Sequence, residues 1–340
     1  MIKNKPLKVI VSVLLSLLIF ACVLMLGIKA WFQLPQIKYY NASTVAFEIP
    51  GISDNFVPQG FCYDEQNNVY IVSGYLSKDG ASPLYVLDGT NGKVLKKINL
   101  AKSNGKEFTG HSGGVAVWGD YLYISAGSGV GVYVFDYSSV LSAENGGVVK
   151  YTGKFSTEKS DDDYVGSSYV TVYDNKIIIG EFYSEKGYDK PDSHKVTCES
   201  CGETNGALAI EYNLDANYTY GINPTPTKVY STREKVQGVN VDNGKFYLST
   251  SQAFNPSYIY SYNVSDLKLC GNRQTIGYTL PLYTLCSCSH NKTYKTPPMA
   301  EEIVFRNGKL YIMSEFACNK YILGKFAGGK WCYATDLEKM

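Results

Sequence analysis

A short strand–turn–strand pattern that recurs along the chain constrains its fold more than any other feature. The clearest copy occupies residues 237–250, where two alternating apolar segments flank Asn243-Gly244. An Asn-Gly pair in this setting is typical of a two-residue β-hairpin turn, because glycine adopts a positive φ without a Cβ clash. The sequence therefore predicts two antiparallel strands that are joined at Asn243 and Gly244.

The pattern has four further copies, and together the copies indicate a repeat fold. They occupy residues 59–73, 114–125, 169–180 and 302–313. The second strands of all five copies align at one position, occupied by Tyr70, Tyr123, Ile178, Tyr247 and Tyr311, at intervals of 53 to 69 residues. An all-β repeat of about fifty residues is typical of a propeller. We therefore expect an all-β, five-bladed β-propeller.

Each copy is followed by further strand-like segments that would complete a blade. Third strands are expected at residues 84–88, 132–136, 208–212, 258–262 and 321–325, and fourth strands at residues 94–100, 148–155, 228–232 and 275–282. The fifth copy has no fourth strand of its own, whereas Thr44–Ile49 is a spare strand before the first copy. We expect this N-terminal strand to close the ring, since closure removes a sheet edge that would invite aggregation.

The N-terminus has the character of a membrane segment. Three lysines precede residues 9–28, which are twenty residues without a charge, and about 20 apolar residues span a bilayer as a helix. Lysines next to such a segment favour the cytoplasmic side. We therefore expect a cytoplasmic n-region at residues 1–8, a transmembrane signal-anchor at 9–28, a stalk at 29–43, and a propeller at 44–340 on the extracellular side of the plasma membrane.

Two other interpretations of the N-terminus stay open. A signal peptide would be cleaved near Ala30, although the apolar segment is long for that role. A lipoprotein would use Cys22, but bulky Phe20 and the apolar residues after Cys22 disfavour it. All three interpretations place the propeller outside the cytoplasm.

Charge and cysteine content narrow the classes of partner and the compartment. The net charge is +1 without a basic stripe, so we expect no nucleic-acid partner. Eight cysteines lie outside the apolar segment, and an even number in an oxidising compartment favours disulfide bonds. Two pairs, Cys198 with Cys201 and Cys286 with Cys288, fall in long loops expected at residues 184–205 and 284–299. Four sulfur atoms on one rim are also a tetrahedral zinc set, although Cys-x-Cys spacing is unusual for zinc, so disulfides are the favoured prediction.

The candidate site is the axial mouth on the face that carries these two long loops. In a propeller, the starts of the first strands and the ends of the second strands meet there. The expected ligand-binding residues are Gln59, His111, Glu181, Gln237, Glu301 and Glu302. The catalytic candidates are Glu301, Glu302, His111 and Glu315, because carboxylates and histidine in a cleft supply general acid–base chemistry or bind a hard cation. Polar strand ends that merely solvate a channel would give the same pattern.

The first copy resembles a known blade motif. The segment Pro58-Gln59-Gly60-Phe61-Cys62-Tyr63-Asp64-Glu65, followed by Asn68-Val69-Tyr70-Ile71-Val72, is similar to the blade opening of the SMP-30/strictosidine-synthase-like and YncE-like propellers. That resemblance implies either a calcium-dependent lactonase or esterase, or a surface protein without catalysis. Lactonase-type members carry a metal-binding glutamate where this chain has Gln59, and Glu301 is the equivalent position in the last copy. Those families mostly have six blades.

Two functions of different classes follow. The first is a surface-anchored protein that binds a small molecule, a glycan or a protein at the axial mouth. The second is an extracellular hydrolase or lactonase that uses the carboxyl groups of the mouth. No cofactor is required by the first function, and calcium at Glu301 is the cofactor expected for the second.

Overall fold

The predicted hairpin at residues 237–250 forms in the structure and shows how each sheet is built. β18 (Val236–Asp242) pairs antiparallel with β19 (Lys245–Thr250), and Asp242 faces Lys245 across a two-residue turn. Both turn residues have positive φ, 46° at Asn243 and 70° at Gly244, as this turn requires. Asparagine tolerates the left-handed region better than most residues, so the turn fixes the register of the strands.

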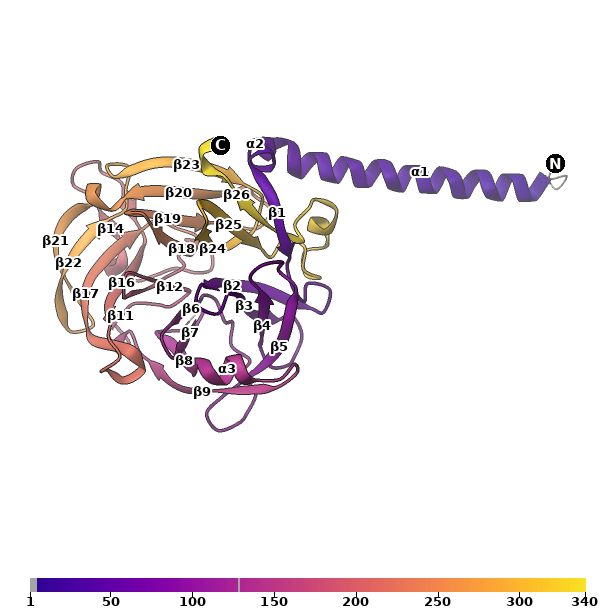
Figure 1. Cartoon of the computed structure of the whole chain (residues 1–340). Coiled ribbons are helices and arrows are strands. Elements are labelled where there is room, and N and C mark those ends of the chain that lie inside the picture. The colour runs from indigo at the N-terminus through magenta and orange to yellow at the C-terminus, as the bar shows by residue number, and fades with distance from the viewer. Residues whose placement is uncertain (1–4, 128) are drawn as a thin grey trace.

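The computed structural model describes residues 5–127 and 129–340, and β-sheets form a ring from which one long helix projects (Figure 1). The described residues form six β-sheets. One sheet has eight strands, one has six, two have four and two have two. The first strands of the repeats contact one another in a closed cycle, β2 with β6, β6 with β12, β12 with β18, β18 with β24, and β24 with β2. The architecture is therefore an all-β, propeller-like fold with a single N-terminal apolar helix.

The strands of the first half build the eight-stranded sheet. Its members are β2 (Phe56–Asp64), β3 (Val69–Leu76), β4 (Pro83–Asp88), β5 (Val94–Ala101), β6 (Val115–Trp118), β7 (Tyr121–Ser125), β8 (Val132–Asp136) and β9 (Val148–Phe155). Each set of four is antiparallel, and the outer strands β5 and β9 pair parallel across the gap between the sets. A short helix, α3 (Tyr137–Ser142), follows β8, and the two-stranded β10 (Glu158–Ser160) and β11 (Asp163–Tyr164) follow β9.

The second half has three sheets around the axis. β12 (Tyr169–Tyr173), β13 (Lys176–Gly180), β16 (Ala207–Leu214) and β17 (Ile222–Thr232) belong to the six-stranded sheet. β20 (Ser257–Asn263) and β23 (His290–Thr296) follow β18 and β19 in a four-stranded sheet. The last sheet has the order β1-β26-β25-β24, with β24 (Ala300–Arg306), β25 (Lys309–Ser314) and β26 (Trp331–Thr335). Short 3-10 turns complete this half, namely η2 (Asp192–His194), η3 (Thr219–Gly221), η4 (Val264–Asp266) and η6 (Leu337–Lys339).

The N-terminal strand joins the C-terminal sheet, as the sequence predicts. β1 (Ser43–Glu48) pairs antiparallel with β26, with Ser43 opposite Thr335 and Glu48 opposite Trp331. Phe47 on β1 is buried, and its ring lies 5.8 Å from that of Phe61 and 4.9 Å from that of Tyr70, both in the first repeat. The two ends of the chain are thus held together by strand pairing and by aromatic packing.

Two predicted strands are wrong. Residues 275–282 do not supply the fourth strand of their sheet, because β21 (Lys268–Thr275) and β22 (Tyr278–Thr284) form a hairpin that pairs parallel with β17 of the preceding sheet. β23, within the segment expected to be a loop, takes the predicted place beside β20. Of the predicted strand at 321–325, residues 322–325 belong instead to a 3-10 turn, η5 (Ile322–Phe326), and the third strand of the last sheet is β26.

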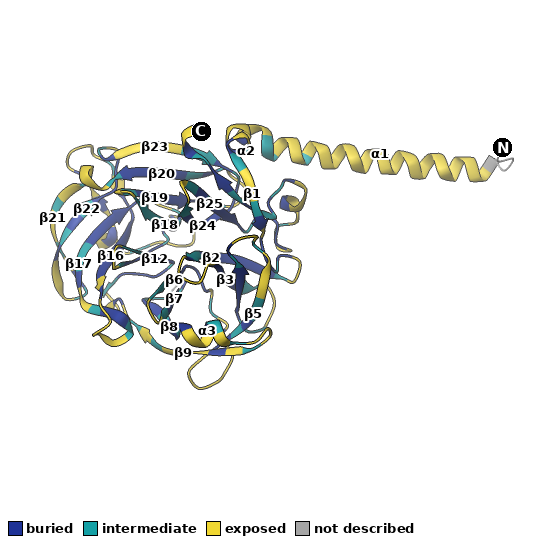
Figure 2. Cartoon of the chain, viewed as in Figure 1, coloured by how far each residue is buried: buried dark blue, intermediate teal, exposed yellow. Residues whose placement is uncertain are grey.

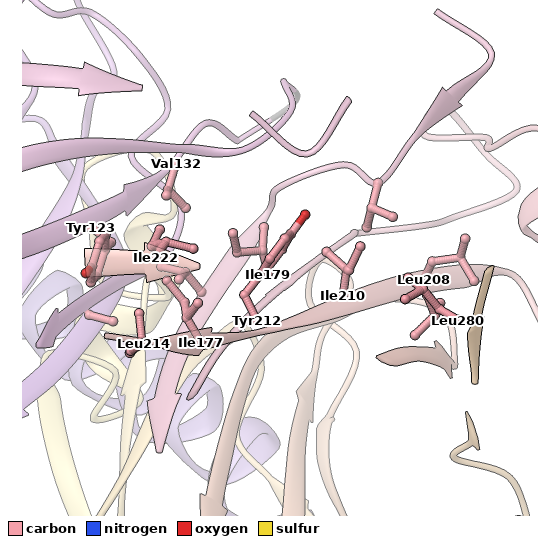
Figure 3. Packing of buried hydrophobic residues seen from close by; sticks show 14 of the residues in the cluster. Tyr123, Val132, Ile177, Ile179, Leu208, Ile210, Tyr212, Leu214, Ile222 and Leu280 are labelled. Atoms are coloured by element: carbon pink, nitrogen blue, oxygen red, sulfur yellow. The ribbon is translucent and has the colours of Figure 1, made fainter. Parts of the chain in front are cut away.

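The hydrophobic core lies between neighbouring sheets. Buried side chains of β7, β8, β12, β13, β16, β17 and β22 form one cluster, part of which Figure 3 shows with Tyr123, Ile177 and Ile210 labelled. Aliphatic and aromatic residues of the inner strands fill these clusters, and Figure 2 shows the ring as predominantly buried around the axis. This close packing fixes the inner strand ends, and with them the side chains of the mouth.

The N-terminal helix is mostly exposed and ends against the propeller. α1 (Lys5–Gln33) is followed by η1 (Leu34–Gln36) and α2 (Ile37–Asn41), so the segment expected to be a stalk, residues 29–43, is largely helical. The helical segment Pro6–Asn41 is long and apolar enough to cross a membrane, a property that an N-terminal signal sequence shares. Phe32 at its end packs edge-on against Phe316, with ring centroids 4.8 Å apart.

Candidate functional site

Three of the predicted mouth residues form one hydrogen-bonded chain. Gln59, on β2, donates from Nε2 to Oε2 of Glu315 at 2.9 Å, and its Oε1 lies 2.8 Å from Nε2 of His111. Because an amide oxygen accepts but does not donate, this contact requires the proton of His111 to be on Nε2. Gln59 lies near the start of a first strand, His111 lies before β6, and Glu315 directly follows β25. These three places therefore meet, as the repeat register predicts.

A tyrosine and a lysine extend this chain toward the rim. The ring of Tyr75, on β3, stacks on that of His111 with centroids 4.4 Å apart. Nζ of Lys320 donates to the Tyr75 hydroxyl at 3.0 Å and lies over the same ring. We call Gln59, Tyr75, His111, Glu315 and Lys320 the mouth network. Lys320 was missed by the sequence reasoning, because it lies in the irregular segment after β25, where no repeat register places a side chain.

Burial controls the protonation of the acidic groups at the mouth. It raises the pKa of Glu315 to about 7, against the opposing effects of Lys320 and Gln59. It also raises the pKa of Glu301, which the Glu315 carboxyl raises further. Oε1 of Glu301 accepts a hydrogen bond from Nε2 of Gln237 at 3.3 Å. The mouth thus holds two carboxyl groups, Glu301 and Glu315, whose pKa values are raised by burial.

His111 adds a neutral donor to this network. Desolvation of its ring and the charge of Lys320 lower the pKa of His111 below its usual value. Its imidazole is therefore uncharged at neutral pH, and it takes part in the network as a hydrogen-bonding group.

Glu302 lies apart from the mouth network, although it is next to Glu301 in the sequence. Its Oε1 accepts the amide of Val239 at 3.1 Å, and its Oε2 has no hydrogen-bond partner among the described residues. Glu302 borders an axial cavity of about 310 Å³, which is also lined by Asp174 and Asp242 at the far ends of their first strands. Burial raises its pKa. The two neighbouring glutamates therefore have different surroundings, Glu301 beside Gln237 and Glu302 at the axial cavity.

Glu181 holds the first of the two long loops, which we call the first insertion (residues 184–205), to the sheets. Its side chain is fully buried, Oε1 lies 2.9 Å from Nδ1 of His194, and its two oxygens accept the amides of Gly166 and Leu208 at 2.9 and 3.0 Å. Burial opposes ionisation, but the hydrogen bond and charge of His194 outweigh it, and the pKa of Glu181 is lowered. With its acceptors occupied by protein groups, Glu181 is placed to anchor residues 184–205.

A second cavity, larger than the axial one, lies beside the first long loop, residues 184–205. It has a volume of about 750 Å³ and polar walls, formed by Tyr183, Lys195, Glu203, Arg233, Gln252 and Tyr260 among others. The guanidinium carbon of Arg233 lies 3.5 Å from the ring centroid of Tyr260. Arg233 directly follows the fourth strand β17, whereas the predicted site residues lie at first-strand starts and second-strand ends, so the repeat pattern gives no signal for it.

The cysteines differ from the expected arrangement. All nine thiols lie within the described residues and all are free, so the expected disulfides are not formed. The predicted convergence of the two pairs is found, since the sulfur atoms of Cys198, Cys201, Cys286 and Cys288 all lie within 4.8 Å of one another. Among the described residues, this is the group of histidine, cysteine and acidic side chains whose ligand atoms are close enough to share a metal ion.

The fold and the site together define an all-β, propeller-like protein with a polar axial mouth and an N-terminal helix that is apolar enough for a membrane. No protein-family model matches the sequence, and no curated protein matches it either.

Several solved structures resemble the chain at low identity. The glutaminyl cyclase of Myxococcus xanthus is 10% identical, with a TM-score of 0.41 over 86% of this chain and 94% of that one. BamB from Moraxella catarrhalis is 11% identical, with a TM-score of 0.36 over 86% and 85%. A chain of a nidogen/laminin complex is 8% identical, with a TM-score of 0.41 over 76% and 73%.

Proposed function

We propose that this protein is a five-bladed β-propeller, anchored in the plasma membrane by residues 9–28, which binds a glycan at its axial mouth on the extracellular side. The observation that carries the binding proposal is the mouth network, in which Gln59 joins His111 to Glu315 at 2.8 and 2.9 Å. The closed cycle of contacts from β2 through β6, β12, β18 and β24 supports the count of five blades.

The chemistry of the mouth favours a ligand rich in hydroxyl groups. Carboxyl, amide, imidazole and phenol groups both donate and accept hydrogen bonds, and the mouth gathers all four in Glu315, Gln59, His111 and Tyr75. The exposed Lys320 adds a cation at the rim. These groups are held by bonds to one another, so little side-chain entropy is lost when they orient a ligand.

An array of oligosaccharides, probed with the full-length chain in detergent micelles, tests this proposal. We expect binding to a subset of glycans, and a loss of affinity of about tenfold or more in Glu315→Gln and Gln59→Ala, since a hydrogen bond to a charged group is worth about 1.5–3 kcal/mol. Glu144→Gln, at an exposed position far from the mouth in the sequence, is the matched control and should bind as the wild type does. Binding that neither mouth variant weakens, or no binding at all, would overturn the proposal.

A second candidate is hydrolysis of an ester, lactone or glycoside at the same mouth. The observation in its favour is the pair of carboxyl groups, Glu315 with a pKa of about 7 and Glu301 with a raised pKa, because acid–base catalysis needs groups that titrate near the working pH. Nitrophenyl esters, nitrophenyl glycosides and simple lactones are suitable probes. Turnover with a midpoint near pH 7 that Glu315→Gln abolishes, while glycan binding persists, would favour this candidate over binding alone.

Calcium at Glu301 stays a proposal that belongs to the second candidate. Calcium prefers ionised carboxylates and other oxygen ligands. Glu301 instead has a raised pKa, and the Gln237 amide nitrogen lies 3.3 Å from its Oε1. Burial and the neighbouring Glu315 carboxyl oppose ionisation of Glu301, which weighs against an ionic ligand at this position. Thermal stabilisation of the wild type by calcium, lost in Glu301→Gln, would support calcium binding.

A further inference from the structure

Hydrogen bonds to the backbone shape the two segments that carry Cys198, Cys201, Cys286 and Cys288. These segments lie in the two insertions, residues 184–205 and 284–299. Cys198 and Cys201 occupy the turn between β14 (Val196–Thr197) and β15 (Thr204–Asn205). The carbonyl of Cys198 accepts the amides of Cys201 and Gly202 at 3.3 and 2.7 Å, and Gly202 has a φ of 73°, which suits glycine. This tight turn brings two thiols at Cys-x-x-Cys spacing to one side.

The second pair is brought to the first by hydrogen bonds that involve no sulfur. Nδ2 of Asn205 donates to the carbonyl of Leu285 at 3.1 Å, next to Cys286. Oε2 of Glu203 accepts the amide of Ser287, between Cys286 and Cys288, at 2.6 Å, and its Oε1 lies 3.5 Å from Nη2 of Arg233. The protein therefore holds the two segments together through its own polar contacts, independently of any bond between the thiols.

We infer that Cys198, Cys201, Cys286 and Cys288 form a tetrahedral site for a zinc(II) ion. Zinc–sulfur bonds of about 2.3 Å in a tetrahedron place the sulfur atoms about 3.8 Å apart. The Sγ atoms of Cys198 and Cys288 are 3.9 Å apart, and all four lie within 4.8 Å of one another. Cys198 and Cys286 are buried, whereas Cys288 is half-buried and Cys201 exposed, so the site is closed inside and reachable from the rim.

The geometry favours a metal over two disulfides. A disulfide needs its two sulfur atoms about 2 Å apart. Two separate disulfides would not require the two pairs of cysteines to lie close to each other. Here each thiol is close to all three others at a separation that suits a shared ion. Any of the four thiols that is still protonated loses its proton to solvent when zinc binds.

The metal has a structural role, because four protein ligands leave no open position on the ion. It fastens the β14–β15 hairpin to residues 285–289, and Glu203, Thr204 and Asn205 of that region line the 750 Å³ cavity. Zinc therefore fixes one wall of this cavity. Cys270 is outside the group of four, with its Sγ 2.6 Å from Oγ1 of Thr284, and it offers a matched control.

Metal analysis of the full-length chain, purified without chelator or reductant, tests the inference. We expect about one zinc per chain, released when a mercurial reagent blocks the thiols. Cys201→Ser and Cys288→Ser should lower the zinc content about tenfold or more, whereas Cys270→Ser should keep it. Cobalt(II) added to the metal-free chain should give the intense visible bands of tetrahedral thiolate coordination in the wild type and in Cys270→Ser, and in neither of the other variants.

Three results would overturn the inference. One is a chain without zinc whose four insertion thiols react only after reduction, which would indicate two disulfides. Another is zinc that is lost in Cys270→Ser but kept in Cys288→Ser, which would show a different set of ligands. The third is four free thiols in a wild-type chain that takes up neither zinc nor cobalt. Because the variants are compared by metal content and by cobalt spectra, a fall in stability alone does not decide the outcome.

Discussion

At the scale of single residues, the acidic side chains differ mainly in what surrounds each carboxyl group. Glu302 has a raised pKa because burial outweighs the amide of Val239, and its Oε2 has no hydrogen-bond partner among the described residues. Glu181 is equally buried, yet its pKa is lowered, because His194 and two backbone amides surround it. The same residue type is thus a source of instability in one place and an anchor in another.

We predict that Glu302→Gln stabilises the protein at alkaline pH. A carboxyl whose folded pKa exceeds its unfolded pKa binds more protons when folded, so the free energy of unfolding falls as the pH rises from about 4.3 through the folded pKa. Glutamine does not ionise and avoids this loss. Thermal melting should show the variant more stable than the wild type by about 1 kcal/mol or more at pH 8, with a smaller difference at pH 5. Glu158→Gln, at an exposed position, is the control, and an equal difference at both pH values would contradict the prediction.

We predict the opposite behaviour for Glu181. Removing one partner of a buried pair leaves the other without compensation, so Glu181→Ala should lower the free energy of unfolding by about 3–5 kcal/mol. Because folding lowers the pKa of Glu181, the ionised side chain stabilises the folded state. This stabilisation is complete above the unfolded pKa and is lost as the pH falls through the folded pKa. Denaturant unfolding at several pH values measures this. His194→Ala should be similarly destabilising, whereas His290→Ala, at an exposed position, should not.

At the scale of secondary-structure elements, β1 is the strand that joins the two ends of the chain. We predict that Phe47→Ala lowers the free energy of unfolding by about 3–5 kcal/mol, because it removes a buried ring that contacts Phe61 and Tyr70. Val45→Ala in the same strand is the control, since Val45 is 53% exposed, and it should cost well below 1 kcal/mol. Similar losses in the two variants would show that pairing with β26 matters more than this aromatic packing.

The elements that could be predicted are those with regular repeats and recognisable turns. Asn243-Gly244 identified its hairpin because asparagine and glycine share a preference for positive φ. The turn between β21 and β22 uses Ile276 at a φ of 46°, a conformation that a β-branched residue rarely adopts, so no residue signal indicated it. The segment Tyr321-Ile322-Leu323 has the composition of a strand, but a 3-10 turn begins at Ile322, and in it Gly324 packs against the backbone of Phe316.

Part of the candidate site could likewise be predicted from the regular repeats, and part could not. The repeat register brought Gln59 and Glu315 to one mouth, because the starts of first strands and the ends of second strands lie on the same face. The separation of Glu301 from Glu302 follows from strand alternation together with a bulge between Ala300 and Ile303, which sequence alone did not reveal. Lys320 lies in an irregular segment, and its Nζ contacts the Tyr75 hydroxyl and the ring of Tyr321, neither of which a repeat register predicts.

At the scale of the whole molecule, the end of the N-terminal helix packs against the segment that also carries Glu315 of the candidate mouth. Phe32 packs on Phe316, which directly follows Glu315, and Nε2 of Gln33 donates to the carbonyl of Ala327 at 3.1 Å. Trp31 is 77% exposed at the same end of the helix, where an aromatic side chain would suit a membrane interface. The mouth is therefore close to the point at which the chain leaves the apolar helix.

The orientation across the membrane is the last prediction. Lysines before the apolar segment should stay in the cytoplasm, so the propeller should lie outside. We expect a membrane-impermeant amine reagent, added to intact cells, to label exposed lysines of the propeller such as Lys102 and Lys292, and to label Lys8 only after the membrane is opened. Peptide mapping by mass spectrometry measures both, and an intact mass that includes residues 1–30 distinguishes an anchor from a cleaved signal peptide. Labelling of Lys8 in intact cells, with the propeller protected, would reverse the orientation and place the mouth in the cytoplasm.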